Sequence, residues 1–399
     1  MSPATAQATC HAAIDALRRG DARGARAGFE QVVSAGQADA DALLGLAYAC
    51  GNLRDTAAAL SAVDAALALA PRDLRALIYR ADLSAAAGDD RAAAAFYRAV
   101  TRAAPPAEHL SEPVSEQMPP ALRQEVARAE AMCERYAQRF EQHLRQRLGP
   151  VGAAGERFAQ SLELLFGRKQ IYRQEPRLYY FPALPQIQFY PRADFPWLDR
   201  VEAAAAEIRA EMLAILQEET AFSPYVQGVE NRPSLTQGGM LDNRDWSAFY
   251  LWKDGAPVAA NAARCPHTMA ALAEVPMCRM PGRGPAILFS LLRPGARIPA
   301  HHGFLNTRLI CHLPLTVPLT VPPSCGFRVG NETREWAEGQ AWLFDDTIEH
   351  EAWNLSDQPR VILLFEVWRP ELTASERAMV SALFEAIDQQ QGGRAEWGI

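Results

Sequence analysis

The first hundred residues repeat at an interval of 34 residues, and this period constrains the fold more than any other feature of the chain. The segment is rich in alanine, and Gly51 and Gly88 each separate two stretches that favour helix. Pro71 recurs as Pro105 at the same interval. The other copied positions are Asp39, Ala42, Leu43, Leu44 and Ala47, which reappear as Asp73, Ala76, Leu77, Ile78 and Ala81. A helix pair that recurs in this way buries its apolar face by stacking on the next pair, so we expect a helical-repeat domain.

A period of 34 residues is the length of a tetratricopeptide repeat, and residues 5–105 resemble that family. The period matches, whereas the fullest aromatic signature of the family is missing. The alternative is an ordinary alanine-rich helical bundle. In either case, the expected role is to present a concave surface to a protein or peptide.

The length of 399 residues exceeds what one hydrophobic core usually serves, which predicts more than one domain. A proline-containing stretch from Pro105 to Pro120 interrupts the repeats, and an apolar stripe from Leu122 to Leu144 then predicts a long helix. A shorter helix is expected from Phe158 to Phe166. The predicted divisions are tetratricopeptide-like repeats at 1–105, a helical connector at 106–175 and a C-terminal domain at 176–399.

The C-terminal domain differs in composition, because aromatic residues and proline become frequent from about Pro176. The predicted strands are Ala248 to Trp252, Ala286 to Leu292, Thr307 to Leu315, Phe327 to Val329, Ala341 to Phe344, Glu349 to Trp353 and Val361 to Trp368. Many short strands separated by Gly and Pro turns favour a double-stranded β-helix, that is, a jelly roll or cupin-like barrel. Flanking helices are expected after the start signals Asp194 and Pro196, and from Ala374 to Gln390.

Charge and cysteine usage exclude several classes of function. The formal net charge is -7 and no dense basic block occurs, which argues against a nucleic-acid partner. The seven cysteines are spread without a C-x-x-C pair, so a disulfide framework or zinc cluster is not expected, and a reducing cytoplasm fits best. We expect neither a secretory signal nor a membrane span, since the apolar runs are too short.

Two histidines, His301 and His350, lie 49 residues apart in the region of predicted strands. A jelly roll can place two such strands side by side, and two imidazoles beside open coordination positions are typical of non-haem Fe(II) oxygenases. Arg360, at the head of an apolar strand, could hold a carboxylate of a dicarboxylate cosubstrate through its planar fork. The alternative for Arg360 is a surface side chain that caps a turn with Asp357.

Several motifs in fixed order resemble the aspartyl/asparaginyl β-hydroxylase family over about residues 180–372. They are Phe289-Ser290 through Pro294-Gly295, His301-x-Gly303-x-x-Asn306-x-Arg308-Leu309-x-x-His312-Leu313, the run Arg328 to Trp336, Phe344-Asp345-Asp346-x-x-Glu349-His350-Glu351-x-Trp353 and Val367-Trp368-x-Pro370-Glu371-Leu372. The resemblance implies an Fe(II)- and 2-oxoglutarate-dependent dioxygenase that uses O2 as cosubstrate.

The resemblance also implies a role for each matching residue. His301 and His350 would bind the iron, and Asp346 would hold a water in the vacant ligand position. Ser290 and Arg360 would bind the distal carboxylate of 2-oxoglutarate, with His312 near the metal. Arg308 is the candidate for an acidic group of the substrate.

This sequence departs from the usual patterns at three positions. Most 2-oxoglutarate oxygenases carry an acidic ligand two residues after the first histidine, where Gly303 stands here, and the resembled family lacks it too. Animal members of the family carry a second arginine at the position of Ile310, so one carboxylate contact is missing. His302 is unusual beside a ligand, and we expect it near the metal site or at the surface.

The leading hypothesis is hydroxylation of the β-carbon of an Asp or Asn in a protein or peptide that the repeats recruit. A second hypothesis keeps the chemistry but changes the substrate to a free or carrier-bound amino acid or a lipid acyl chain, for which Ile310 leaves room. A third is a repeat-based interaction protein with an inactive barrel. The intact set of His301, His350, Arg360 and Ser290 argues against this third hypothesis.

Overall fold

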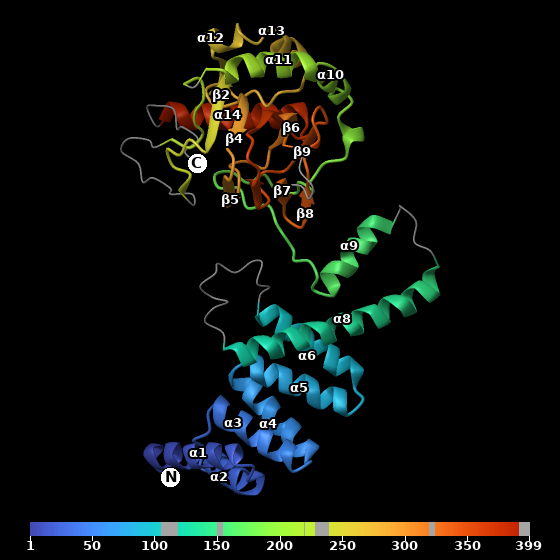
Figure 1. The fold of residues 1–399 in the computed structure, drawn as a ribbon, viewed down its shortest axis with the longest axis vertical. Helices are drawn as coiled ribbons and strands as arrows, with labels where there is room; N and C mark the ends of the chain where they lie inside the picture. Colours follow the sequence, from blue (N-terminus) through green and yellow to red (C-terminus); the bar gives the residue numbers. More distant parts are fainter. Residues whose placement is uncertain (105–118, 150–154, 219, 228–238, 319–323, 391–399) are drawn as a thin grey trace. The chain divides into compact units, whose positions relative to one another are not determined.

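A computed structural model of the chain describes residues 1–104, 119–149, 155–218, 220–227, 239–318 and 324–390. The chain divides into two compact units, Met1–Gln170 and Ile171–Ile399 (Figure 1). The predicted break at Pro105 to Pro120 lies outside the described residues as far as position 118, and so does the turn at Pro322-Pro323.

The first unit is entirely helical in its described residues. Its helices are α1 Pro3–Arg18, α2 Ala22–Ser34, α3 Ala40–Asn52, α4 Thr56–Leu69, α5 Leu74–Ala86, α6 Asp90–Ala103, α8 Pro120–Leu148 and α9 Glu156–Leu165. Asp21, Asp55 and Asp89 precede α2, α4 and α6 at intervals of 34 residues, and each accepts a hydrogen bond from a backbone N–H in the first turn. A capping carboxylate satisfies a helix donor that would otherwise lack a partner, so the repeat is marked by its helix starts as well as by its apolar positions. The predicted helical repeat is confirmed.

The apolar stripe predicted on the long helix packs within the first unit. Val126, Ala129 and Cys133 of α8 are buried in one cluster with Leu77 of α5 and Tyr97 of α6. Helix α8 therefore covers the open side of the last repeat, as a capping helix does. The unit ends at Gln170, within the segment predicted as a helical connector.

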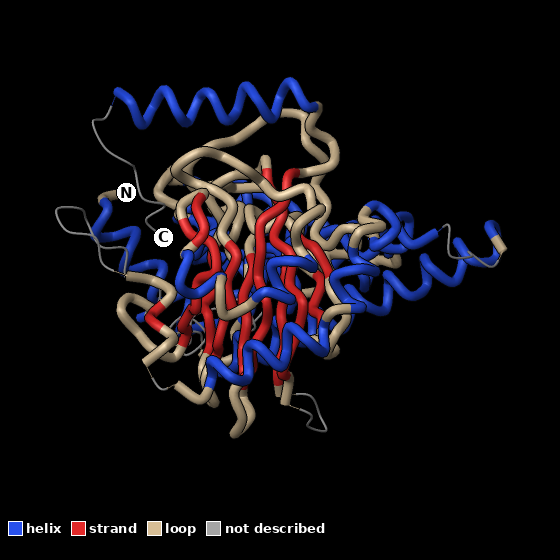
Figure 2. Tube along the Cα trace, turned by 90° about the horizontal axis from the view of Figure 1, so that it is seen from above, coloured by secondary structure: helices blue, strands red, loops and turns tan. Residues whose placement is uncertain are grey.

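The second unit contains two antiparallel sheets (Figure 2). The strands are β1 Ser223–Pro224, β2 Trp246–Lys253, β3 Ala256–Pro257, β4 Ile287–Leu292, β5 Arg297–His301, β6 Arg308–Thr316, β7 Cys325–Val329, β8 Glu332–Arg334, β9 Trp342–Phe344, β10 His350–Asn354 and β11 Arg360–Trp368. The larger sheet has the order β1-β2-β4-β11-β6-β9, with β3 on β2, and the smaller sheet has the order β5-β10-β7-β8. The jelly-roll connectivity stays a prediction.

The two sheets share one apolar layer. Leu288 and Ile362 from the larger sheet pack in one cluster with Ile298, Phe327 and Ala352 from the smaller sheet. This layer surrounds the site described below, so the site lies between sheets that are themselves held by apolar burial.

Helices cover the outer face of the larger sheet. The helices of this unit are η3 Arg192–Asp194, α10 Leu198–Ala203, α11 Ala205–Leu216, α12 Ala259–Ala262, α13 Pro266–Ala271 and α14 Ala374–Gln390. Ile208 and Met212 of α11 pack in the same cluster as Phe289 and Leu363 of the sheet. The single helix expected from Asp194 onward is divided into η3, α10 and α11. Among the described residues, no helix has the length and apolar character needed to cross a membrane.

Seven predicted strands are confirmed as β2, β4, β6, β7, β9, β10 and β11, whereas β5 was not expected as a strand. Pro299 lies at its centre and gives the segment the appearance of a turn. Proline cannot donate to a β ladder and is tolerated on an edge strand, and β5 lies at one end of the smaller sheet. The omission matters because β5 carries His301.

Candidate active site

His301 and His350 are direct neighbours across a strand pair. His301 ends β5, His350 begins β10, and the antiparallel register places the two residues opposite each other. Their ring centroids are 4.0 Å apart, with 51° between the ring planes. The structure therefore brings together the two imidazoles that the sequence places 49 residues apart.

Backbone carbonyls orient both rings. His301 Nδ1 lies 2.7 Å from the carbonyl oxygen of Pro299, and His350 Nδ1 lies 3.1 Å from that of Ile348. A carbonyl oxygen can only accept, so each Nδ1 donates its hydrogen and each Nε2 keeps a lone pair. This is the tautomer that binds a metal through Nε2, with the other ring nitrogen held by the protein.

Burial keeps both imidazoles neutral. Loss of solvent lowers the pKa of His350 to about 4. Burial, followed by the proximity of His350, lowers the pKa of His301 well below its ordinary value. Neutral imidazoles near pH 7 are electron-pair donors, which suits them to bind a cation.

The carboxylate of Asp346 lies beside Gly303. A Cβ built on Gly303 would collide with the Asp346 carboxylate, so a side chain at position 303 would displace that carboxylate. Asp346 is 5% exposed, and its Oδ1 has no hydrogen-bond partner among the described residues. The described residues contain no group of three or more His, Cys, Asp or Glu side chains arranged to hold a metal. A metal here would thus have two imidazole ligands and further positions for other molecules.

Arg360 is buried without an anionic partner. The side chain begins β11, and the residue is 1% exposed. Its contacts among the described residues are a long hydrogen bond of 3.5 Å to the Ser290 carbonyl and the face of Trp336, 4.7 Å from the ring centroid. Its Nε has no partner there. Burial lowers the pKa of the guanidinium to about 10, which shows how poorly the protein alone solvates this charge.

Ser290 and His312 lie in the same pocket as Arg360. The Trp246 indole N–H donates to Ser290 Oγ at 3.1 Å, which leaves the hydroxyl hydrogen of Ser290 available for another acceptor. His312 Nδ1 is buried without a hydrogen-bond partner among the described residues. Burial and then the charge of Arg360 lower the pKa of His312 well below its ordinary value.

Arg308 is already engaged by two carboxylates. Its Nη2 lies 3.0 Å from Asp346 Oδ2, and its Nη1 forms an ion pair with Glu366. Glu366 was not expected as a site residue, although a charged side chain inside the apolar strand Val361 to Trp368 is a recognisable signal of a buried partner. The role of Arg308 as a substrate anchor stays a prediction.

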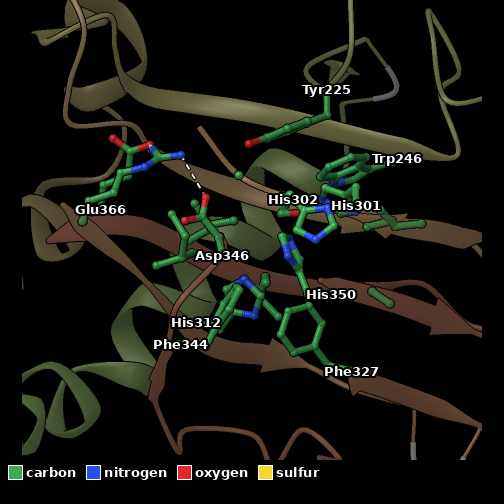
Figure 3. A pocket seen from close by; sticks show the side chains of 18 of the residues that line it. Tyr225, Trp246, His301, His302, His312, Phe327, Phe344, Asp346, His350 and Glu366 are labelled. Atoms are coloured by element: carbon green, nitrogen blue, oxygen red, sulfur yellow. Dashed lines mark hydrogen bonds and ion pairs between the residues drawn. The ribbon is translucent and has the colours of Figure 1, made fainter. Parts of the chain in front are cut away.

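One pocket collects all seven residues that the sequence singled out (Figure 3). They are Ser290, His301, Arg308, His312, Asp346, His350 and Arg360. His302 also lines the pocket, with Nε2 3.9 Å from Glu175 Oε2. Tyr225, Phe304 and Glu366 line it as well and were missed, because their distant or unremarkable sequence positions do not mark them.

This concentration of buried imidazoles, carboxylates and arginines in one pocket of a two-sheet domain is typical of an enzyme. The family comparison agrees: residues 202–370 match the model of the family described as Aspartyl/Asparaginyl beta-hydroxylase. The second unit of the chain therefore belongs to the aspartyl/asparaginyl β-hydroxylase family.

Known relatives carry the same domain in different settings. Aspartate beta-hydroxylase domain-containing protein 2 of Xenopus tropicalis is 32% identical over 53% of this chain and 55% of its own length. The ornithine lipid ester-linked acyl 2-hydroxylase of Rhizobium tropici is 35% identical over 45% of this chain and 60% of its own length. The chain thus spans little more than half of either relative. Its helices are similar to the first TPR of Spaghetti (RPAP3), at 19% identity and a TM-score of 0.25, over 33% of this chain and 99% of that one.

Proposed function

We propose that the second unit is an Fe(II)- and 2-oxoglutarate-dependent hydroxylase. The observation that carries this proposal is Arg360, a buried guanidinium without an anion, in the same pocket as two neutral imidazoles. A buried cation is costly unless a partner arrives, so the pocket is built for a ligand that bears a carboxylate.

The side chains suit iron at one end of the pocket. Nε2 of His301 and Nε2 of His350 would be its two protein ligands, and the family origin of the domain favours iron over other metals that imidazole binds. The unpaired Oδ1 of Asp346 would accept a hydrogen bond from a water in a remaining position.

The side chains also suit 2-oxoglutarate. Arg360 would bind the distal carboxylate and Ser290 would donate its free hydroxyl hydrogen to it, while His312 would lie beside the cosubstrate. Iron, 2-oxoglutarate and O2 together supply the chemistry: one oxygen atom enters a substrate C–H bond, and 2-oxoglutarate leaves as succinate and CO2. The protein's own task is to orient the C–H bond and to exclude water with the apolar layer of the two sheets.

The family supports the β-carbon of an Asp or Asn as the substrate position. We propose that the substrate is a protein or peptide and that the helical repeats of the first unit recruit it, because stacked helix pairs offer an extended surface.

A second candidate is a small or lipid substrate, such as a free or carrier-bound amino acid or an acyl chain. Two observations favour it: Ile310 is an apolar residue of the pocket, and a relative at 35% identity is named as an acyl 2-hydroxylase.

Substitution of the unpaired arginine tests the proposal. Arg360→Met should weaken 2-oxoglutarate binding by about a hundredfold or more, because a charged hydrogen-bonded pair is lost. It should also raise the midpoint of thermal unfolding of the ligand-free protein by about 2 to 4 °C, since an uncompensated charge leaves the interior. Quenching of tryptophan fluorescence by 2-oxoglutarate and succinate formation measure the first effect, and calorimetry measures the second.

The matched control is Arg297→Met, which alters an exposed arginine of β5 and should leave both quantities unchanged. Normal 2-oxoglutarate affinity in Arg360→Met would refute the assignment of the cosubstrate site.

A further inference from the structure

Resting on the proposed function, we infer that this pocket selects a substrate whose reacting part is uncharged, because Glu366 and Asp346 neutralise the one arginine that could anchor a substrate carboxylate. The matching target is an amide side chain or an aliphatic chain rather than an aspartate. Glu366 and Ile310 would then be specificity-determining residues.

Arg308 has few means left to hold a third anion. Its two Nη nitrogens each contact a protein carboxylate, one from Asp346 at 3.0 Å and the other from Glu366. A guanidinium recognises a carboxylate best through two parallel N–H bonds from its fork, and both arms of this fork are engaged. The side chain is only 11% exposed, so solvent does not compensate for a rearrangement.

Glu366 is held in place by more than Arg308. Its Oε2 accepts a hydrogen bond from the backbone N–H of Ala286 at 3.0 Å, and the residue is 7% exposed. A buried carboxylate with two fixed partners does not swing away to make room for a substrate carboxylate. The arrangement of Arg308 with Glu366 is therefore a property of the empty scaffold and of the loaded pocket alike.

The charge balance of this end of the pocket opposes an acidic group. One guanidinium faces two carboxylates, so the local charge is negative or, if Asp346 holds a proton, zero. An incoming carboxylate would meet like charges with no unpaired cation to offset them. The other unpaired cation of the pocket, Arg360, is assigned to the cosubstrate.

The neighbouring wall adds no positive charge. Ile310 pairs with Glu366 across β6 and β11 and is 5% exposed, so an apolar side chain stands beside the glutamate. Tyr225 lines the opposite wall and points toward Asp346 and Glu366 (Figure 3). A phenol and an aliphatic side chain suit a neutral group that needs at most one hydrogen bond.

The test compares substrates that differ only in charge. Three probes share one backbone: N-acetylaspartate amide, N-acetylasparagine amide and N-acetylnorvaline amide. The full chain is supplied with Fe(II), 2-oxoglutarate and O2, and succinate formation above the probe-free rate is measured together with the mass gain of one oxygen atom. We expect at least one neutral probe to stimulate the wild-type protein about tenfold more than the aspartate probe.

Glu366→Gln is the decisive variant because it keeps the shape and the acceptor for Ala286 while removing the negative charge. It should shift the preference toward the aspartate probe by about tenfold. Ile310→Arg, which adds a cation without touching the Arg308 pair, should shift the preference in the same direction and guards against a folding defect in the first variant. Thermal unfolding of both variants is measured in parallel.

Two results would overturn the inference. One is a wild-type preference for the aspartate probe. The other is an unchanged preference in both variants, including the case in which no probe stimulates any of the proteins. The cosubstrate assignment is tested separately by probe-free 2-oxoglutarate turnover and its loss in Arg360→Met, so a live cosubstrate site with the wrong preference would refute only this inference.

Discussion

Arg360 and Arg369 are the two largest side chains that the described fold buries completely, and the protein treats them in opposite ways. Arg369 contacts the Asp345 carboxylate at 2.8 Å and the carbonyl oxygens of Asn306 and Pro185 at 3.1 and 2.8 Å. Arg360 has no carboxylate among the described residues. A satisfied buried cation stabilises an arrangement, whereas an unsatisfied one awaits a ligand, so equal burial signifies structure in one case and binding in the other.

The metal-site imidazoles should make the metal-free protein sensitive to mild acid. An unfolded histidine titrates near 6.5, whereas folded His350 titrates at about 4. Between these values the unfolded chain binds a proton that the folded ring refuses, so the free energy of unfolding falls as pH falls from about 6.5 to 4. The loss from this group amounts to about 3 kcal/mol. Urea unfolding at a series of pH values measures the slope.

His350→Gln should flatten that slope, because the variant no longer carries a group whose pKa differs between the two states. The control is His267→Gln, which removes an exposed histidine of the same unit and should retain the wild-type slope. Equal slopes in wild type and His350→Gln would contradict the burial of a neutral imidazole at this position.

At the scale of elements, the turn between β9 and β10 decides where His350 lies. Asp345 fixes this turn by accepting hydrogen bonds from the Thr347 backbone N–H at 3.0 Å and the Thr347 hydroxyl at 2.6 Å. The same carboxylate accepts from Gln174 at 2.6 Å and from Arg369. One carboxylate thus joins three segments beside the metal-binding strand.

Asp345→Asn should be strongly destabilising because the amide leaves Arg369 as a buried cation without an anion. We expect a loss of about 3 to 5 kcal/mol in the free energy of unfolding, measured by urea denaturation. Asp357→Asn, in the exposed turn between β10 and β11, should change it by less than about 0.5 kcal/mol. A comparable loss in both variants would show that Asp345 has no special role.

The whole molecule consists of two units that each have their own hydrophobic clusters. Independent cores predict independent unfolding, so calorimetry of the full chain should show two transitions. Fe(II) with 2-oxoglutarate at about a hundred times its dissociation constant, without O2, should stabilise only the second unit by about 2.7 kcal/mol. The ligand should therefore raise one transition by about 5 to 10 °C.

A chain of residues 171–399 provides the control, since it should reproduce the ligand-responsive transition alone. A single transition in the full chain, or a ligand shift in both transitions, would show that the two units do not unfold separately.

Local signals account for the parts of the fold that were predicted well. The helix from Ala374 to Gln390 was predicted with both ends correct, and the 34-residue period located the helical repeats. Strand β5 was missed because Pro299 resembles a turn when the sheet edge is unknown. The three aspartates that cap α2, α4 and α6 were overlooked although their spacing repeats, since attention fell on apolar positions.

The sequence by itself determined the repeat period, the strands and the set of residues able to bind a metal and a dicarboxylate. Only the tertiary structure decided that His301 faces His350 across a strand pair, that Arg360 has no anion, and that Arg308 is shared by Asp346 and Glu366. The physical reason is that charge compensation depends on distances of a few ångströms in space. Residues 38 and 58 positions beyond Arg308 reach that distance only when the sheets have paired.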